Sequence, residues 1–265
     1  MHPNLSHYQT TTMNEIGVKR RSKFLEIWKE LDLAPEYVHS ANENIENSYA
    51  FFSNSLNRHM TGLGGCLKSH RNAWKLFLES EHEFALITED DAIPSPKIKS
   101  EITKIQTYLS NCSLSDPSIV INKINELGKP AYVQLGWYAY PRLSIKQFIV
   151  AAHHLMKFNG PIRNSYVRGH GFANHCYLIN REMAIFLLDK LSSEGLPLDL
   201  QMMTFARHDA YKECHIIRSC QNYATQEGLD SSIHSGVTPA QDTVFSKILV
   251  WVQSLADANG NRFAI

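Results

Sequence analysis

Apolar residues recur along the first part of the chain with two alternating spacings. Spacings of three and four residues predict helices over 19–31 and 66–78. Each predicted helix leads into a short apolar run, over 36–39 and 84–88, of the length that buried strands have. Helices that repeatedly lead into buried strands are typical of a parallel α/β sheet, so the chain is expected to form a mostly parallel sheet flanked by helices.

The rest of the chain extends this pattern. Apolar strands are predicted over 130–136, 175–180 and 213–219, and the second of them runs directly into a helix over 181–191. Helical pieces within 94–129 and a helix over 143–158 are expected as insertions above the sheet, where specificity usually resides.

No internal repeat, low-complexity tract or linker divides the sequence, which predicts one domain over residues 1–265. A C-terminal helix over about 239–257 carries an apolar stripe with a single lysine. That stripe favours packing against the body, or against a second copy in a homodimer, over membrane anchoring.

Composition narrows the class of protein. Hydrophobic residues make up 43% of the chain and charged residues 20%, which is ordinary for a globular protein. Lysine and arginine number 26, as do aspartate and glutamate, so no basic excess favours nucleic acid as a partner.

The five cysteines are scattered without a C-x-x-C pair, which fits a reducing compartment. The N-terminus lacks an apolar signal segment and no run reaches the roughly 20 apolar residues of a membrane span, so a cytoplasmic protein is expected, with peripheral contact at the inner membrane left open.

Three consecutive carboxylates, Glu89, Asp90 and Asp91, follow the predicted strand over 84–88. Ligands of open α/β sheets bind at the carboxyl ends of the strands, which is where this triplet lies. In an extended chain Glu89 and Asp91 point to one side and Asp90 to the other. Two oxygen donors on one side suit Mg or Mn, which can also hold a diphosphate; the alternative is a solvated acidic turn.

Several other residues are weaker candidates. The glycine-rich stretch 61–66 is predicted to open a helix and could receive an anion at its amides, although it is not a G-x-G-x-x-G motif. Ser69 and His70 follow it, and local hydrogen bonding is favoured over catalysis for this pair. Among the histidines, His175 at the start of a strand and His234 between small residues are kept as candidate ligands, although a lone histidine is more often structural.

Six segments together resemble, in order and spacing, glycosyltransferase family 25, which includes bacterial lipooligosaccharide galactosyltransferases and collagen galactosyltransferases. The resemblance extends over about residues 17–235. Its most specific part is G-C-x-x-S-H followed by an apolar strand and E-D-D. The six segments are "GCLKSHRNAWKLFL", "FALITEDDA", "YVQLG", "HCYLINREMAIFLLDKL", "LPLDL" and "SCQNYATQEGLDSSI".

The resemblance implies a GT-A fold, a Rossmann-like α/β sheet, and inverting transfer of galactose or glucose from a UDP-sugar to a glycan or glycolipid acceptor such as a lipooligosaccharide. It also implies a divalent cation, Mn or Mg. Asp91 is the first choice of metal ligand, with Glu89 and His234 beside it. Donor contacts are assigned to a set drawn from three segments: Glu89, Asp90, Ser69, His70 and His175.

Asp199 lies at the family's P-x-D position in "LPLDL" and is the chosen catalytic base, with Glu227 and Asp230 in reserve. The alternative is that Asp199 only caps the helix that follows it.

The chain departs from the family pattern in two places. Asn4 and Leu5 are kept without the apolar run that usually precedes them, and Ala173-Asn174-His175 replaces the usual Gly-Thr-His. The weak first strand motivates a second hypothesis, a degenerate fold that acts as a non-catalytic glycan-binding or scaffold subunit.

Overall fold

The computed structural model describes residues 4–11, 15–39, 54–110, 130–138, 166–168, 170–191, 198–207, 214–219 and 222–226. Two predicted helices, over 143–158 and 239–257, lie outside these residues, as does His234. Among the helices that the structure describes, none has the length and hydropathy needed to cross a membrane.

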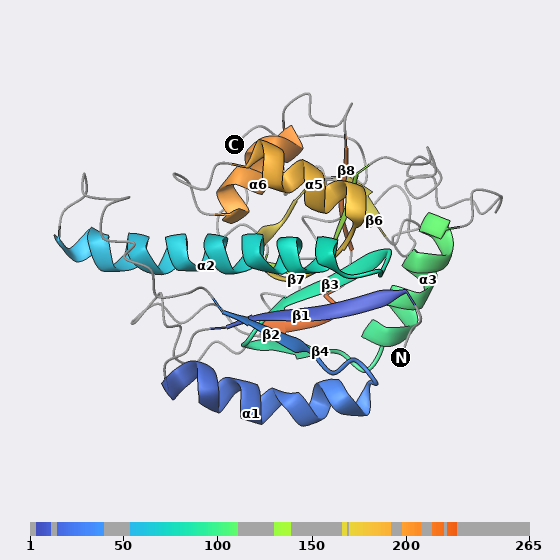
Figure 1. The fold of residues 1–265 in the computed structure, drawn as a ribbon, viewed down its shortest axis with the longest axis horizontal. Helices are drawn as coiled ribbons and strands as arrows, with labels where there is room; N and C mark the ends of the chain where they lie inside the picture. Colours follow the sequence, from blue (N-terminus) through green and yellow to red (C-terminus); the bar gives the residue numbers. More distant parts are fainter. Residues whose placement is uncertain are drawn as a thin grey trace, which may run out of the picture.

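A seven-stranded sheet forms the centre of the protein, with helices on both faces (Figure 1). Its strands lie in the order β2-β1-β3-β7-β5-β8-β6. β1 pairs in parallel with β2 and β3, and β5 pairs in parallel with β8, whereas β7 and β6 run against their neighbours. The mostly parallel α/β class predicted from the sequence is therefore confirmed. The strands of this sheet are β1 (Leu5–Thr11), β2 (Glu36–His39), β3 (Phe84–Glu89), β5 (Ala131–Tyr138), β6 (Tyr166–Arg168), β7 (Phe172–Asn180) and β8 (His215–Ser219).

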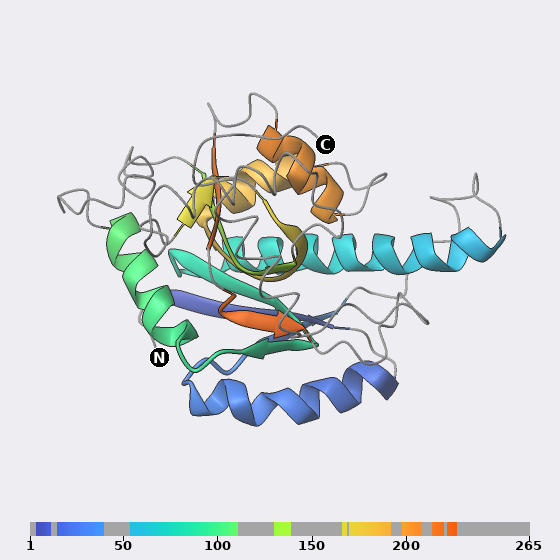
Figure 2. The same cartoon turned by 180° about the vertical axis from the view of Figure 1, so that it is seen from behind.

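Two short strands, β4 (Ala92–Pro94) and β9 (Ala224–Gln226), pair antiparallel in a second small sheet (Figure 2). The described helices are α1 (Glu15–Glu30), α2 (Asn54–Glu79), α3 (Ile98–Ser110), α5 (Arg181–Lys190) and α6 (Leu198–Arg207). α3 supplies one of the helical pieces expected between the third strand and the next.

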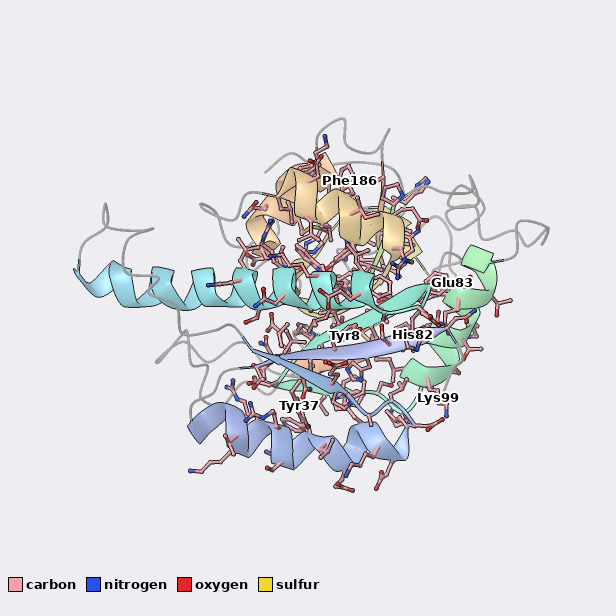
Figure 3. The ribbon with its side chains drawn as sticks, viewed as in Figure 1. Tyr8, Tyr37, His82, Glu83, Lys99 and Phe186 are labelled. Atoms are coloured by element: carbon pink, nitrogen blue, oxygen red, sulfur yellow. The ribbon has the colours of Figure 1, made fainter. Side chains whose placement is uncertain are left out.

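Two apolar clusters cover the two faces of the sheet, and β3 shows how one strand serves both. Phe84 and Leu86 belong to the cluster that contains α1 and α3, whereas Ala85 and Ile87 belong to the cluster that contains α2, α5 and α6. Successive side chains of a strand point to opposite faces, so a strand covered on both sides is apolar throughout. Side chains fill the space between the sheet and the helices on each side (Figure 3).

α2 and α5 are joined by arginines that reach the ends of the neighbouring helix. Arg181 donates to four backbone carbonyls, those of Phe77 and Leu78 in the last turn of α2 and those of Ser80 and His82 just after it. Arg71 of α2 donates in return to the carbonyls of Leu188 and Leu191. The last carbonyls of a helix have no partner within it, so these contacts satisfy them and fix α5 against α2.

β1 is a complete strand, contrary to the weak first strand that the sequence suggested. Its residues are buried although most are polar, because their polar groups find partners across β3. The His7 ring contacts the Leu33 carbonyl at 2.6 Å and the Thr88 hydroxyl at 2.9 Å, and Thr10 donates to the Thr88 carbonyl at 3.2 Å. Burial lowers the pKa of His7 to about 4, against a smaller raising effect of its bond to Leu33, so this ring is neutral at neutral pH.

α2 begins earlier than predicted and overturns one interpretation. The helix runs from Asn54, so the stretch 61–66 lies inside it and does not form a loop at its start. Amide groups inside a helix are bonded to the carbonyl four residues earlier and are not available to an anion. The predicted anion-binding loop is therefore wrong.

β5 and β7 approach each other closely where glycine replaces a side chain. A Cβ added to Gly136 would lie 2.4 Å from Nε2 of His175 and 2.9 Å from the carbonyl oxygen of Ala224. On β7, Ala173 has φ of 71°, in the left-handed region that favours glycine. The Gln134 amide donates to the carbonyls of Gly171 and Ala173, and its oxygen accepts from the Gly171 amide, which secures this irregular part of β7.

Replacing Gly136 by alanine should lower the free energy of unfolding by about 1 to 3 kcal/mol, because the new methyl group overlaps His175 and the β9 backbone. Denaturant unfolding followed by circular dichroism measures the change.

Ala173→Gly, the reverse exchange on the neighbouring strand, is the matched control. Its expected change in the free energy of unfolding has the opposite sign. It relieves roughly 1 to 2 kcal/mol of left-handed strain against roughly 0.5 to 1 kcal/mol of added chain entropy. It should be neutral or stabilising; a Gly136→Ala variant as stable as Ala173→Gly would contradict the close approach.

Candidate active site

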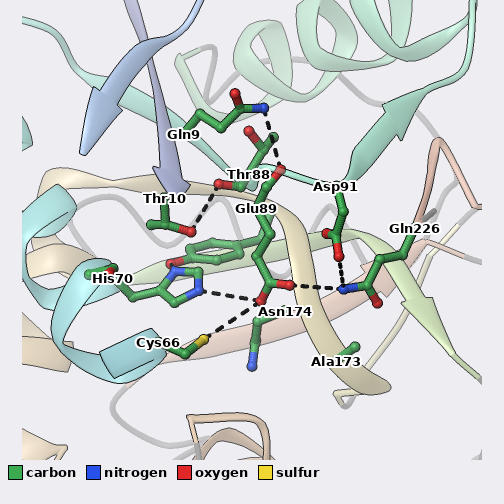
Figure 4. Close-up of polar contacts among 12 residues, drawn as sticks. Gln9, Thr10, Cys66, His70, Thr88, Glu89, Asp91, Ala173, Asn174 and Gln226 are labelled. Atoms are coloured by element: carbon green, nitrogen blue, oxygen red, sulfur yellow. Dashed lines mark hydrogen bonds and ion pairs between the residues drawn. The ribbon is translucent and has the colours of Figure 1, made fainter. Parts of the chain in front are cut away.

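The three carboxylates lie at the carboxyl end of β3: Glu89 is the last residue of the strand, and Asp90 and Asp91 form the turn to β4. Glu89 and Asp91 face the same side, since the Gln226 amide nitrogen donates to both, at 3.1 Å to Oε2 of Glu89 and 2.9 Å to Oδ2 of Asp91 (Figure 4). Asp90 points the other way, as the alternation of an extended chain predicted. β9 carries Gln226 and pairs with β4 directly after Asp91, which holds the amide in place.

Asp90 is occupied by contacts within the fold. Its Oδ2 accepts from the Thr11 hydroxyl at 2.8 Å, and its Oδ1 lies 3.3 Å from Nη1 of Arg20. All three residues are buried, so Asp90 connects the end of β1 and helix α1 to the site turn. We therefore assign Asp90 to holding this turn and not to the donor contact expected from the sequence.

Asp91 is the carboxylate with unused capacity. Its Oδ1 atom is buried and accepts no hydrogen bond among the described residues. Burial raises the pKa of Asp91 well above its usual range, and the charges of Glu89 and Asp90 raise it further, against smaller lowering effects of Arg20 and Gln226. A cation bound nearby would therefore strongly stabilise the ionised form of Asp91.

Glu89 differs from Asp91 because it has more partners. Its Oε1 lies 3.5 Å from Nε2 of His70 and 3.8 Å from the Cys66 sulfur (Figure 4). Burial raises the pKa of Glu89, but His70, His175 and Cys66 together outweigh it, and the pKa is lowered. Two neighbouring carboxylates thus have pKa values shifted in opposite directions, which is characteristic of functional sites.

Two aromatic residues orient His70 through Nδ1, the ring nitrogen that faces away from Glu89. Its Nδ1 lies 2.8 Å from the Tyr177 hydroxyl, which also accepts from Nε1 of Trp74 at 3.0 Å. These contacts turn Nε2 toward Glu89. Ser69, the neighbouring candidate, instead donates to the Gly65 carbonyl one turn earlier at 2.9 Å, which is the local hydrogen bonding favoured for it.

His175 lies on β7 beside the same cluster. It is fully buried and its Nε2 lies 3.1 Å from the Ala224 carbonyl oxygen on β9. Burial lowers the pKa of His175, while the Glu89 charge and the bond to Ala224 raise it by less. This histidine therefore ties β7 to the strand that carries Gln226, and a direct donor contact stays a prediction.

Asp199 lies in the first turn of α6, where a carboxylate interacts favourably with the helix dipole. Its charge also contributes to raising the pKa values of Cys66 and Tyr132, behind the larger effect of burial at both. The carboxylate is therefore close enough to act electrostatically on the cluster. Its catalytic role stays a prediction.

Three residues of the site were not assigned from the sequence: Cys66, Tyr177 and Gln226. Cys66, Tyr177 and Gln226 all stand inside the segments that carry the family resemblance, so their presence there was a usable signal. Tyr177 appeared only as one apolar residue of a strand. His234, Glu227 and Asp230 lie outside the described residues.

Comparison with known proteins identifies the class. A family model described as glycosyltransferase family 25 (LPS biosynthesis protein) matches residues 26–202, which is more than half of the chain. No curated protein matches the sequence.

Two solved structures are similar in outline. One is A197 from STIV, with 10% identity, 83% of each chain covered and a TM-score of 0.42. The other is a glycosyltransferase involved in the glycosylation of the major capsid of PBCV-1, with 13% identity, 82% of this chain and 93% of that chain covered, and a TM-score of 0.35.

The mixed α/β sheet, with paired carboxylates at its carboxyl edge, and the family match agree on a glycosyltransferase. The chain belongs to glycosyltransferase family 25.

Asp91→Asn should stabilise the protein without metal, because it removes a buried charge that the fold disfavours. The folded-state pKa is raised, so wild type loses stability as pH rises through that value and regains it as pH falls toward the ordinary value of 3.8. The excess stability of the variant should grow as the pH rises above about 4, toward the folded-state pKa, and should shrink again as the pH approaches about 4. Unfolding in chelator at several pH values measures it.

Asp90→Asn is the matched control, since it makes the same chemical change one residue away. It should cost about 1.5 to 3 kcal/mol at neutral pH, because it removes the closer of two carboxylate contacts of the buried Arg20, 3.3 Å to Asp90 against 3.7 Å to Asp91. Equal effects of the two substitutions would contradict the division of roles between Asp90 and Asp91.

Proposed function

We propose that this glycosyltransferase is metal-dependent and inverting, and that it transfers galactose or glucose from a UDP-sugar to a glycan acceptor such as a lipooligosaccharide. The observation that carries the proposal is the buried Oδ1 of Asp91, which accepts no hydrogen bond among the described residues while its carboxylate converges with Glu89 on Gln226. Such an atom is costly in a folded protein unless a ligand completes it. The family description as an LPS biosynthesis protein supports the choice of acceptor.

Asp91 and Glu89 have the chemistry to hold Mg or Mn, since both ions take carboxylate oxygens. When bound, the cation would neutralise the charge that develops on the departing diphosphate. Gln226 contributes by donating to both carboxylates, and Arg20 lies 3.3 Å from Oδ1 of Asp90 and 3.7 Å from Oδ2 of Asp91. The turn is thus ordered before any ligand arrives, which lowers the cost of binding.

His70 and Cys66 keep Glu89 ionised, since both contacts lower its pKa. This leaves Glu89 as an acceptor, able to hold a ribose hydroxyl or a water molecule of the cation. The contacts with His70 and Cys66 are made by Oε1 of Glu89. Its Oε2 atom therefore points toward Gln226, which also binds Asp91.

Inversion in one displacement needs a base that removes the proton of the acceptor hydroxyl while the sugar moves. Asp199 is our choice for two reasons. Its charge acts on residues that border the cluster, and it comes from α6, which covers the face of the sheet opposite to α1 and its partner Asp90. The acceptor would then approach between α6 and the site turn. We expect the reaction in the cytoplasm, with any membrane contact peripheral.

The hypothesis of a non-catalytic scaffold subunit rested on a weak first strand. β1 is fully formed and pairs with β3 from Leu5 to Thr10 and with β2 from Tyr8 to Thr11. No observation among the described residues favours that alternative.

UDP should bind more tightly in the presence of Mn than in chelator, and a UDP-hexose should release UDP slowly without acceptor. Asp91→Asn should remove most of the Mn-dependent gain in UDP affinity and change the affinity in chelator little, because the substitution removes the charge and keeps the shape. Calorimetric titrations of both proteins with and without Mn provide the measurement.

Asp189→Asn, on the exposed surface of α5, makes the same chemical change away from the site and should behave like wild type. Equal Mn-dependent affinities of wild type and Asp91→Asn would sink the assignment of Asp91. Absence of binding and turnover with every common UDP-sugar would sink the proposed function itself.

Asp199→Asn should reduce the rate of transfer to acceptor by about 10²- to 10⁴-fold, the range for loss of a general base. UDP affinity with Mn should change little, because the base acts on the acceptor. Steady-state kinetics together with UDP titration separate the two effects. A variant with unchanged kcat would restrict Asp199 to a helix-terminal role.

A further inference from the structure

Cys66, His70 and Glu89 gather three different metal-binding atoms at one point. The Cys66 sulfur, Nε2 of His70 and a carboxylate oxygen of Glu89 all lie within 4.8 Å of one another (Figure 4). Cys66 and His70 are four residues apart on α2, so they share one helix face, and β3 brings Glu89 against that face. Two elements thus place a thiol, an imidazole and a carboxylate together.

His70 gives a second and independent indication of a ligand. Its side chain is fully buried, yet among the residues that the structure describes Nε2 makes no hydrogen bond, and Oε1 of Glu89 lies 3.5 Å from it. The other ring nitrogen is held by Tyr177, whose oxygen is fixed in turn by Trp74. A histidine that binds a metal through one nitrogen is generally oriented through the other by such a contact.

The geometry points to a second cation site formed by Cys66, His70 and Glu89, suited to a thiophilic divalent ion, with Zn²⁺ as the natural occupant. Thiolate and imidazole ligands select zinc over magnesium or manganese, which prefer oxygen. Zinc bonds of about 2.0 to 2.3 Å in a tetrahedron place ligand atoms about 3.5 Å apart. The observed separations from Oε1 of Glu89, 3.5 Å to His70 and 3.8 Å to Cys66, require little movement.

Charge balance is favourable at this site. The Cys66 thiol donates to Oε1 of Glu89 at 3.8 Å, so it holds its proton without metal. Binding would replace the S–H bond by a sulfur–zinc bond and release one proton to solvent. The resulting thiolate and the Glu89 carboxylate neutralise the two charges of zinc, and three protein ligands leave a fourth position for water or a ligand.

Glu89 would then be shared between two cation sites. Its Oε1 faces Cys66 and His70, while its Oε2 faces Gln226 and, through it, Asp91. Zinc on the first oxygen would fix the carboxylate that borders the proposed nucleotide site. The zinc site itself is independent of the proposed function, because it needs no nucleotide.

The first test titrates the full chain with Zn²⁺ against a competing chelator dye, in excess Mg²⁺ that occupies oxygen-only sites. Wild type should bind zinc at a site that Cys66→Ser and His70→Asn each remove, whereas Asp91→Asn should retain it. His82→Asn, a histidine outside the cluster, is the matched control and should also retain it. Retention by Cys66→Ser and His70→Asn, or loss in Asp91→Asn alone, would overturn the proposal.

Two further measurements do not depend on whether those variants fold. In wild type, zinc should protect Cys66 from alkylation, as measured by peptide mass spectrometry, and Co²⁺ should give a thiolate charge-transfer band. Tyr177→Phe keeps the ring but removes the hydroxyl behind His70, and should weaken zinc binding by about 10- to 100-fold. Cys66 that is alkylated at the same rate with and without zinc would refute the site even if zinc binds elsewhere.

Discussion

Three adjacent carboxylates, Asp90 and Asp91 buried and Glu89 partly buried, can share one turn only if each meets a different environment, and the arrangement of the site follows from that constraint. Like charges at this spacing raise one another's pKa values, and burial adds to the effect. The fold places Asp90 against Arg20 and Thr11, Glu89 against Cys66 and His70, and leaves one oxygen of Asp91 without a hydrogen bond among the described residues. Asp91 is therefore the carboxylate whose negative charge the protein compensates least, and a cation would bind there.

The polar strand β1 provides the support on which this division depends. A strand covered on both sides is normally apolar, yet β1 carries His7, Gln9, Thr10 and Thr11 inside the protein. Each of these side chains has a hydrogen-bond partner on or directly after β3, and Thr11 is bonded to Asp90 itself. A buried polar network of this kind is stable only when its members are satisfied, so β1 specifies the register and position of the strand that ends in the site.

On the opposite side, the site turn depends on backbone contacts that a side chain would block. Gly136 allows His175 to approach β9, and the β4–β9 pair places Gln226 between Glu89 and Asp91. Ala173, with a backbone conformation that favours glycine, lies two residues before His175. Strained conformations of this kind persist where the surrounding structure fixes them, often near functional sites.

The sequence by itself determined the features that local patterns encode. The apolar periods gave the helices that cover the sheet, and the position of Glu89, Asp90 and Asp91 directly after an apolar strand gave their place at its edge and their alternate directions. Tertiary structure alone decided that a polar N-terminal stretch is a strand, that the glycines over 61–66 lie within a helix, and which carboxylate keeps an unsatisfied atom. The physical reason is separation along the chain: Thr11 is 79 residues from Asp90 and Gln226 is 135 residues from Asp91, so no local pattern reports these partners. Burial and pairing of polar groups set the chemistry of the site, and both arise only when distant segments pack together.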